Sequence, residues 1–327
     1  MICSRILSKR IKNASVVFNR NLQQNKTEFI KPEVTEVQIK VPWGTIAGKF
    51  WNYGCKQPIL ALHGWQDNAG SFDMLAPLLK NRSILAIDAP GHGISTWLPK
   101  GIPYHDSVII HVIRRIKRYF GWEKVKLMGH SGGAIASFRY ASFYPEETEF
   151  VVAIDALQFT PLTPTRFPQS NKDVASDIDK FLIYEEKNSP APCHTEQMAI
   201  ERWMKATHGS LNEVAARTLM IRGATRKEDG TYYFNRDPNI RLNASNIGYT
   251  LDHLKEVAKV INCPYILLRG TESKLKAIFS QDIMDVMQNS CKEFSVHMVP
   301  GTHHLHMVNP QGTADVINPF LDRNNKI

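Results

Sequence analysis

A serine stands at the centre of residues 129–133, which read Gly-His-Ser-Gly-Gly. The apolar run 125–128 before them predicts a strand, and residues 134–138 after them predict the start of a helix. A serine on such a sharp strand-to-helix turn presents its hydroxyl outward, and the flanking glycines let neighbouring chain pass closely. This spacing predicts that Ser131 is a nucleophile.

A serine hydroxyl is a poor nucleophile at neutral pH, so it needs a general base and an acid that orients the base. Three histidines follow the last predicted strand, in the loop where a base comes in the chain order serine, acid, histidine: His303, His304 and His306. The residues alone leave the choice among these three open.

Two carboxylates compete for the role of the orienting acid. Glu272 is the only acid in the turn after the predicted strand 265–268, and Asp155 ends the earlier predicted strand 150–154. Both keep the required chain order. We prefer Glu272 and keep Asp155 as the alternative.

The oxyanion of an acyl-transfer reaction needs two preorganised N–H donors. We expect the backbone N–H of Gly132, directly after the serine, to be one donor. The backbone N–H of Trp65, after the predicted strand 58–62, is expected to be the other. The His303-x-x-His306 spacing also invites a metal ion, but no carboxylate or cysteine lies nearby in the motif. We therefore expect no metal and no cofactor.

Strands and helices alternate along most of the chain, which predicts an α/β fold with a mainly parallel sheet and helices on both faces. Residues 34–51 predict an antiparallel hairpin at the sheet edge. The alternation stops within 156–246, where prolines interrupt the early part, so this segment is interpreted as an inserted, mostly helical cap. The core is then 31–155 with 247–327, and 1–30 forms a basic N-terminal tail.

The net charge of +9 is concentrated at the N-terminus. Residues 1–27 hold six basic residues and no acid, which leaves only +3 on the remaining 300 residues. A near-neutral body gives no reason to expect a nucleic-acid partner. The sequence contains no run of about 18 apolar residues, so it predicts no membrane span. The five cysteines have no paired spacing, which favours a reducing compartment.

The basic, acid-free N-terminal stretch fits two interpretations, a mitochondrial presequence and a disordered tail. The expected location is intracellular, in the mitochondrion or alternatively in the cytoplasm or peroxisome. The last three residues, Asn-Lys-Ile, match the peroxisomal Ser-Lys-Leu signal poorly.

Residues 35–322 resemble the α/β-hydrolase superfamily. The stretches 63–73, 88–101 and 129–133 more narrowly resemble the serine hydrolase-like proteins of the Kraken type. The resemblance implies a nucleophilic Ser131, a lid over the site, and His303 as the base, because superfamily members often end with Gly-His-x-x-His-Leu. Two residues depart from the pattern: Thr302 replaces a glycine, and Ser273 stands where an aspartate is common.

These observations predict a serine hydrolase that cleaves a small carboxylic ester, thioester or amide through an acyl-enzyme on Ser131. A small acyl compound is the expected substrate, and the oligomeric state is not predicted. The alternative is a binding protein that kept the fold and lost turnover, which the missing aspartate motivates. Four apolar residues in the cap are candidates for an acyl pocket, although core packing is the plainer interpretation: Phe159, Phe167, Trp203 and Met204.

Overall fold

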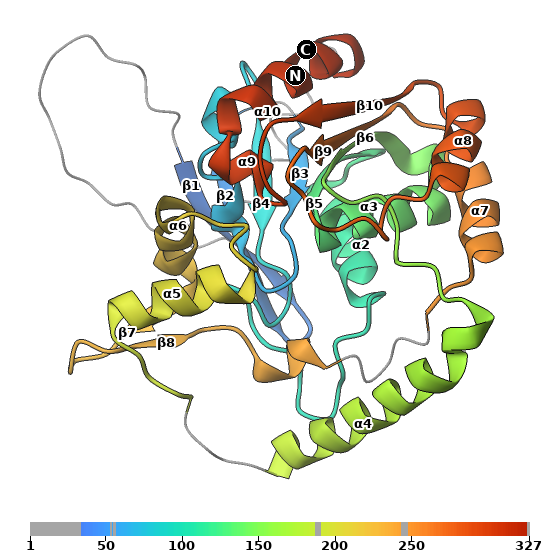
Figure 1. Cartoon of the computed structure of the whole chain (residues 1–327). Helices are drawn as coiled ribbons and strands as arrows, with labels where there is room; N and C mark the ends of the chain where they lie inside the picture. Colours follow the sequence, from blue (N-terminus) through green and yellow to red (C-terminus); the bar gives the residue numbers. More distant parts are fainter. Residues whose placement is uncertain (1–33, 53, 55–56, 187–190, 243–247, 326–327) are drawn as a thin grey trace, which may run out of the picture.

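The computed structural model describes residues 34–52, 54, 57–186, 191–242 and 248–325. The predicted basic tail, 1–30, lies outside the described residues. Eight strands form one sheet in the order β1-β2-β4-β3-β5-β6-β9-β10, as Figure 1 shows. All neighbours from β4 to β10 run parallel, whereas β1 and β2 form an antiparallel hairpin and β2 pairs antiparallel with β4.

The sheet strands follow the apolar runs of the sequence. Their bounds are β1 Val34–Val41, β2 Gly44–Trp51, β3 Ile59–Leu62, β4 Ile84–Ile87, β5 Val125–His130, β6 Thr148–Ile154, β9 Tyr265–Gly270 and β10 Phe294–Val299. β3 and β4 are buried along their whole length, as expected for central parallel strands covered on both faces.

Alternate residues of the central strands pack in two separate hydrophobic cores, one on each face of the sheet, because successive side chains point to opposite faces. Leu127 packs on one face with α2, α3, α7 and α8, and Met128 packs on the other with α10 and two short 3₁₀ helices. These elements are α2 Val108–Phe120, α3 Gly132–Phe143, α7 Leu251–Lys259, α8 Gln281–Ser290, α10 Pro310–Asn324, η1 Ala69–Phe72 and η2 Ala76–Leu78. The protein has the three-layer α/β architecture that the alternation predicts.

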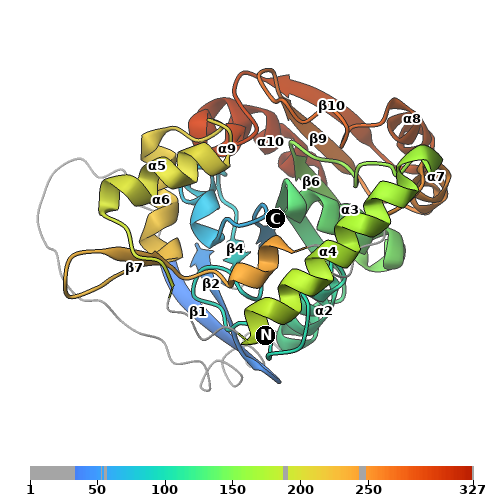
Figure 2. The same ribbon diagram turned by 60° about the horizontal axis from the view of Figure 1, so that its bottom comes forward.

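A long insertion separates β6 from α7. Its helices and small hairpin are η4 Pro164–Arg166, α4 Phe167–Glu186, α5 Glu196–Ala206, α6 Glu213–Gly223, β7 Ala224–Arg226, β8 Tyr232–Phe234 and η5 Pro238–Arg241. Figures 1 and 2 show α5 and α6 together on one side and α4 apart from them along another. We call described residues 156–186 and 191–242 the inserted segment.

Two short helices differ from the sequence expectation. Phe72, Leu75 and Leu79 recur at the spacing of one regular helix, whereas η1 and η2 are separate 3₁₀ turns. Asn68 caps η1 with its side chain and Pro77 lies inside η2, and proline disrupts continuous i→i−4 bonding. Residues 275–287 have a helical pattern in the sequence, but α8 begins only at Gln281, after Ser280.

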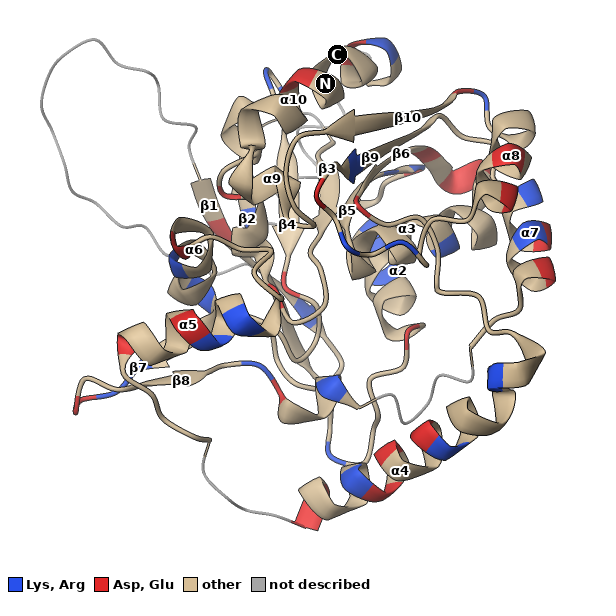
Figure 3. Ribbon diagram, in the orientation of Figure 1, with Lys and Arg blue, Asp and Glu red and all other residues tan. Residues whose placement is uncertain are grey.

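Charge is mixed over the described surface. Figure 3 shows basic and acidic residues together on α4, α5 and α7. No described helix is both long and apolar enough to cross a membrane.

Candidate active site

Ser131 occupies the tight turn between β5 and α3. Its backbone has φ 51° and ψ −116°, a strained conformation for a residue with a side chain. A Cβ on Gly133 would lie 2.0 Å from the carbonyl oxygen of Leu62, and one on Gly129 would lie 2.2 Å from that of Gly133. The two glycines are therefore steric requirements of the turn that holds Ser131.

His303 lies against both Ser131 and a carboxylate. Its Nε2 is 2.8 Å from the Ser131 Oγ, and its Nδ1 is 2.7 Å from the Asp155 Oδ2. A carboxylate only accepts, so Nδ1 donates to Asp155 and Nε2 is left to accept from the serine hydroxyl. The structure thus brings Ser131, His303 and Asp155 into one hydrogen-bonded series.

The preference for Glu272 as the partner of the histidine is wrong. Glu272 is exposed, whereas Asp155 is fully buried and contacts His303. β6 lies between β5 and β9 in the sheet, so Asp155 at its end is next to the serine turn. Asp155 has φ 51°, and this left-handed backbone turns the chain at the strand end.

Two donors from the turn after β9 hold the Asp155 carboxylate. The Gly270 N–H donates to Oδ1 at 2.7 Å, and the Ser273 hydroxyl donates to Oδ2 at 2.5 Å. Ser273, one of the two residues that depart from the family resemblance, therefore binds the carboxylate that comes from the end of β6. This contact was not foreseen, although the unusual serine at 273 was its signal in the sequence.

His130 joins the serine turn to the histidine loop. Its Nε2 lies 2.9 Å from the backbone carbonyl of His303 and donates to it. Sequence reasoning missed this residue, because nothing in the five-residue motif distinguishes its side chain. The contact fixes the backbone that carries the His303 imidazole.

Trp65 and Gly132, the two residues expected to supply oxyanion donors, lie close together beside Ser131. A Cβ on Gly132 would lie 3.4 Å from the Trp65 nitrogen, and both residues line one cavity with Ser131. The Trp65 indole donates to the Ile240 carbonyl at 2.8 Å, which ties this loop to the inserted segment.

A cavity of about 490 Å³ opens beside Ser131 and lies between the core and the inserted segment. Its walls are largely aliphatic: Leu62, Ile87, Val108, Ile109, Ile135, Ile240 and Leu242. Arg139 at the wall pairs with Asp106, so this charge is compensated. Burial lowers the pKa of His92 to about 3, and burial together with Asp237 raises the pKa of Tyr104, so both lining groups are uncharged near neutral pH.

The four apolar candidates for an acyl pocket separate in the structure. Phe159 lines the cavity, whereas Trp203 is buried in a core formed by α5 and α6, and Met204 packs against that core. Phe167 begins α4 and is not among the residues that line the cavity. Core packing thus explains Trp203 and Met204.

The glycine-rich turn 88–95 is organised by Asp88. Its fully buried carboxylate accepts from the backbone N–H groups of Ala69 and Ile94, at 2.8 and 2.9 Å. A Cβ on Gly93 would collide with this carboxylate, at 2.3 Å from its Cγ. These contacts give the turn a structural role.

The family profile described as "alpha/beta hydrolase fold" matches residues 57–310, and the chain belongs to this family. The chain is 39% identical over 296 residues to a "Probable serine hydrolase" of Drosophila melanogaster, covering 88% of this chain and 87% of that one. It is 31% identical to a "Serine hydrolase-like protein" of Danio rerio, with 92% of each chain covered. These relatives make it a serine hydrolase-like member of the family.

A solved structure of a hypothetical protein from Pseudomonas aeruginosa PAO1 superposes with a TM-score of 0.77 at 29% identity. The match covers 88% of this chain and 99% of that one. The similarity therefore extends through the sheet and much of the inserted segment.

Proposed function

We propose that the protein is a serine hydrolase that cleaves a small carboxylic ester, thioester or amide through an acyl-enzyme on Ser131. The observation that carries the proposal is the series Asp155 Oδ2–His303 Nδ1, 2.7 Å, and His303 Nε2–Ser131 Oγ, 2.8 Å. Both distances allow direct proton transfer and orientation by hydrogen bonds.

In the first step, the Ser131 Oγ attacks the carbonyl carbon of the substrate while its proton passes to His303 Nε2. Asp155 orients the ring and stabilises the imidazolium that forms. The tetrahedral oxyanion receives hydrogen bonds from the Trp65 and Gly132 N–H groups, each worth about 3 kcal/mol in comparable sites. His303 then gives its proton to the leaving alcohol, thiol or amine, and the acyl group stays on Ser131.

In the second step, His303 accepts a proton from a water molecule, whose oxygen attacks the acyl carbon. Collapse of this second tetrahedral species releases the carboxylic acid and returns the proton to Ser131. Every proton transfer uses the same Nε2 atom. No step requires a group beyond the chain and water.

The aliphatic cavity supports an apolar acyl group as the bound part of the substrate. Its volume of about 490 Å³ is within the range of small-molecule pockets. Arg139 is paired with Asp106, which weakens it as a binding group for an anionic substrate. Carboxylic esters with short aliphatic acyl chains are the substrates that we propose first.

A panel of p-nitrophenyl esters of increasing acyl length tests this proposal. We expect kcat/KM to rise from the acetate to the butyrate and hexanoate, and to fall for the palmitate, which exceeds the cavity. Ser131→Ala should reduce hydrolysis to the background rate. Equal turnover by wild type and Ser131→Ala would refute the proposal.

The alternative of a binding protein without turnover was motivated by the serine at 273. Asp155 supplies a carboxylate to His303 from another strand, and the Ser273 hydroxyl donates a hydrogen bond to this carboxylate. The serine at position 273 is therefore a weaker argument for a protein without turnover. A folded wild-type protein that neither hydrolyses activated esters nor reacts at Ser131 would restore the alternative.

A further inference from the structure

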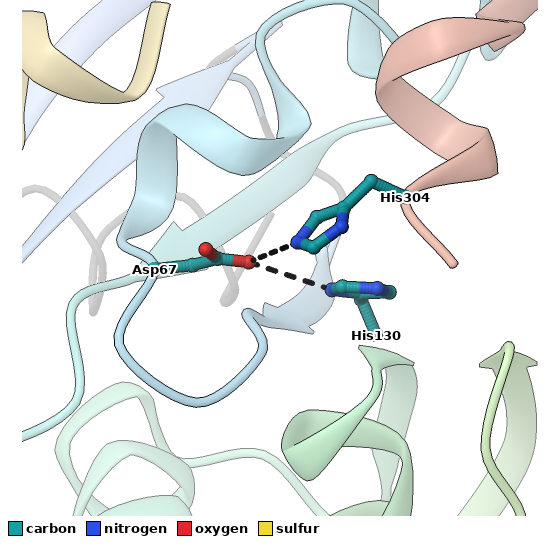
Figure 4. Close-up of side chains that lie close together, drawn as sticks. All are labelled: Asp67, His130 and His304. Carbon is teal, nitrogen blue, oxygen red and sulfur yellow. Dashed lines mark ion pairs between the residues drawn. The ribbon is translucent and has the colours of Figure 1, made fainter. Parts of the chain in front are cut away.

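A second group of polar side chains is buried beside the triad and takes no part in the proposed reaction. Asp67 comes from the loop after β3, His130 ends β5, and His304 follows His303 in the loop after β10. Their exposed fractions are 3%, 0% and 4%. Figure 4 shows the carboxylate and the two imidazoles directed at one another.

Hydrogen bonding leaves two acceptor atoms facing each other in this group. Because His130 Nε2 donates to the His303 carbonyl, the Nδ1 of a neutral ring carries a lone pair. This Nδ1 is 3.6 Å from the Asp67 Oδ2, and neither atom makes a hydrogen bond of good geometry among the described residues, although His304 Nε2 also lies 3.3 Å from the Oδ2. Unpaired buried acceptors are costly, so an electropositive group between them would satisfy both.

The donor atoms have spacings that suit a small divalent cation. Metal–ligand bonds of about 2.0–2.2 Å in tetrahedral geometry place neighbouring ligand atoms about 3.3 Å apart. The Asp67 Oδ2 lies 3.3 Å from His304 Nε2 and 3.6 Å from His130 Nδ1. All three atoms lie within 4.8 Å of one another, so side-chain movements of about 1 Å would complete the geometry.

The far sides of both rings are held as they are in many metal sites. Imidazole ligands usually bond their second nitrogen to a carbonyl, a carboxylate or another polar group, which fixes the ring orientation. His130 Nε2 bonds the His303 carbonyl at 2.9 Å, and His304 Nδ1 lies 2.7 Å from the Ser210 hydroxyl. The nitrogens directed at Asp67 are therefore held in place by these outer contacts.

We propose that Asp67 Oδ2, His130 Nδ1 and His304 Nε2 form a binding site for Zn²⁺ or a similar transition-metal ion. Two imidazoles and one carboxylate are a common donor set for such ions, and three protein ligands leave a fourth position for water. The sequence led us to expect no metal, because no carboxylate lies near the histidine loop. The carboxylate of this site, Asp67, lies more than 230 residues before that loop. It uses none of the three triad side chains.

The bound ion would cross-link three chain segments beside the triad: the loop after β3, the end of β5 and the loop after β10. His130 precedes Ser131 and His304 follows His303, so the ion fixes the chain on both sides of the Ser131–His303 contact. Since the site exists only in the folded chain, the ion also stabilises the fold. A hundredfold excess of ion over Kd should raise the Tm by roughly 5 °C.

Co²⁺ titration of the full-length protein, after treatment with a chelator, tests the proposal without reference to hydrolysis. We expect one equivalent of Co²⁺ to give the intense visible absorption of a tetrahedral or five-coordinate ion, and Zn²⁺ to displace it. Asp67→Asn, which nearly preserves shape, and His304→Gln should each weaken binding by about a hundredfold. Circular dichroism establishes that each variant is folded.

Two control variants locate the bound ion. His303→Ala removes the triad imidazole but keeps the carbonyl that His130 contacts, and Cys193→Ser removes an exposed thiol. Both should retain one tight equivalent. Absence of a saturable equivalent in folded wild type would overturn the proposal and would favour a protonated histidine or a water beside Asp67. Binding that is lost in a control yet retained in Asp67→Asn would also overturn it.

Discussion

Asp155 reaches His303 from β6, whereas the position after β9 carries Ser273. The two strands are neighbours in the sheet, so a carboxylate at the end of either one can approach the same imidazole. In this chain Ser273 and Gly270 donate to the β6 carboxylate and leave it oriented toward Nδ1. In the proposed mechanism, a carboxylate at the end of β6 can therefore orient the imidazole as one after β9 would.

Asp155→Asn should lower kcat for an activated ester by about 10³- to 10⁴-fold, because an amide that donates toward Nδ1 favours the wrong histidine tautomer. Glu272→Gln is the matched control, since Glu272 is exposed and should change kcat less than about threefold. Steady-state kinetics compares the two. A larger loss in Glu272→Gln would contradict the assignment of Asp155.

The sequence predicted two of the three residues in this series. Ser131 followed from its glycine spacing, and His303 from its loop together with the family resemblance. The acid could not be chosen, because Asp155 and Glu272 both follow strands and both keep the chain order. Only the packing of β6 beside β5, and the turn at Asp155, decides which carboxylate meets the ring.

His92 should make stability depend on pH. Its Nδ1 donates to the Pro90 carbonyl, and its Nε2 accepts from the Gln66 N–H at 3.2 Å, so the neutral ring is satisfied on both sides. Burial lowers its pKa from 6.5 to about 3. Between these values the unfolded chain binds a proton that the folded chain does not. The stabilisation is therefore full above pH 6.5 and is lost as the pH falls toward 3.

Comparison with His92→Gln, which cannot titrate there, isolates this effect. Between pH 7.5 and pH 5, wild type should lose about 2 kcal/mol of unfolding free energy relative to the variant. Urea denaturation at both pH values measures it. A difference between the two proteins that does not change with pH would contradict the buried, neutral state of His92.

The serine turn depends on close approach between β5, α3 and the end of β3. Gly133→Ala should destabilise the protein by about 3 kcal/mol or more, because its Cβ would overlap the Leu62 carbonyl. Gly121→Ala is the control: nothing lies within 4 Å, so only its φ of 70° opposes alanine, at about 1 kcal/mol. Equal midpoints in urea would show that the turn tolerates a side chain.

Elements with a strong local signal agree with the sequence prediction. The buried strands follow continuous apolar runs, and α2 follows the helical spacing of Val112, Ile113 and Ile116. The prediction fails where a few capping or proline contacts decide the outcome, as at η1 and η2 and at the start of α8. Such contacts are weak individually and depend on neighbouring loops.

At the scale of the whole molecule, Arg222 joins the inserted segment to the core. Its Nε donates to the buried Asp88 at 2.7 Å, and its Nη1 pairs with Glu36 of β1 at 2.7 Å. The Trp65 and Trp97 indoles add bonds to the carbonyls of Ile240 and Asn235. The alternation of strands and helices stops after residue 155, which predicted an insertion. Local sequence patterns could not predict these contacts between residues far apart in the chain.

Arg222→Met should cost about 3 kcal/mol of unfolding free energy, because it leaves the Asp88 carboxylate buried without its cation. Arg217→Met is the matched control on the same helix. Arg217 pairs with Glu196 and Glu213 at the surface, where such pairs contribute less than about 1 kcal/mol. Chemical denaturation of both variants distinguishes them, and equal losses would contradict the role of Arg222.

In the proposed reaction the Ser131 hydroxyl, activated by His303, is the nucleophile of the folded protein. Incubation with a fluorophosphonate, followed by peptide mass spectrometry, tests it most directly. We predict one adduct on Ser131 in the wild type, none in Ser131→Ala, and much slower labelling in His303→Ala. A folded wild-type protein that remains unlabelled, or that is labelled equally in Ser131→Ala, would contradict the account.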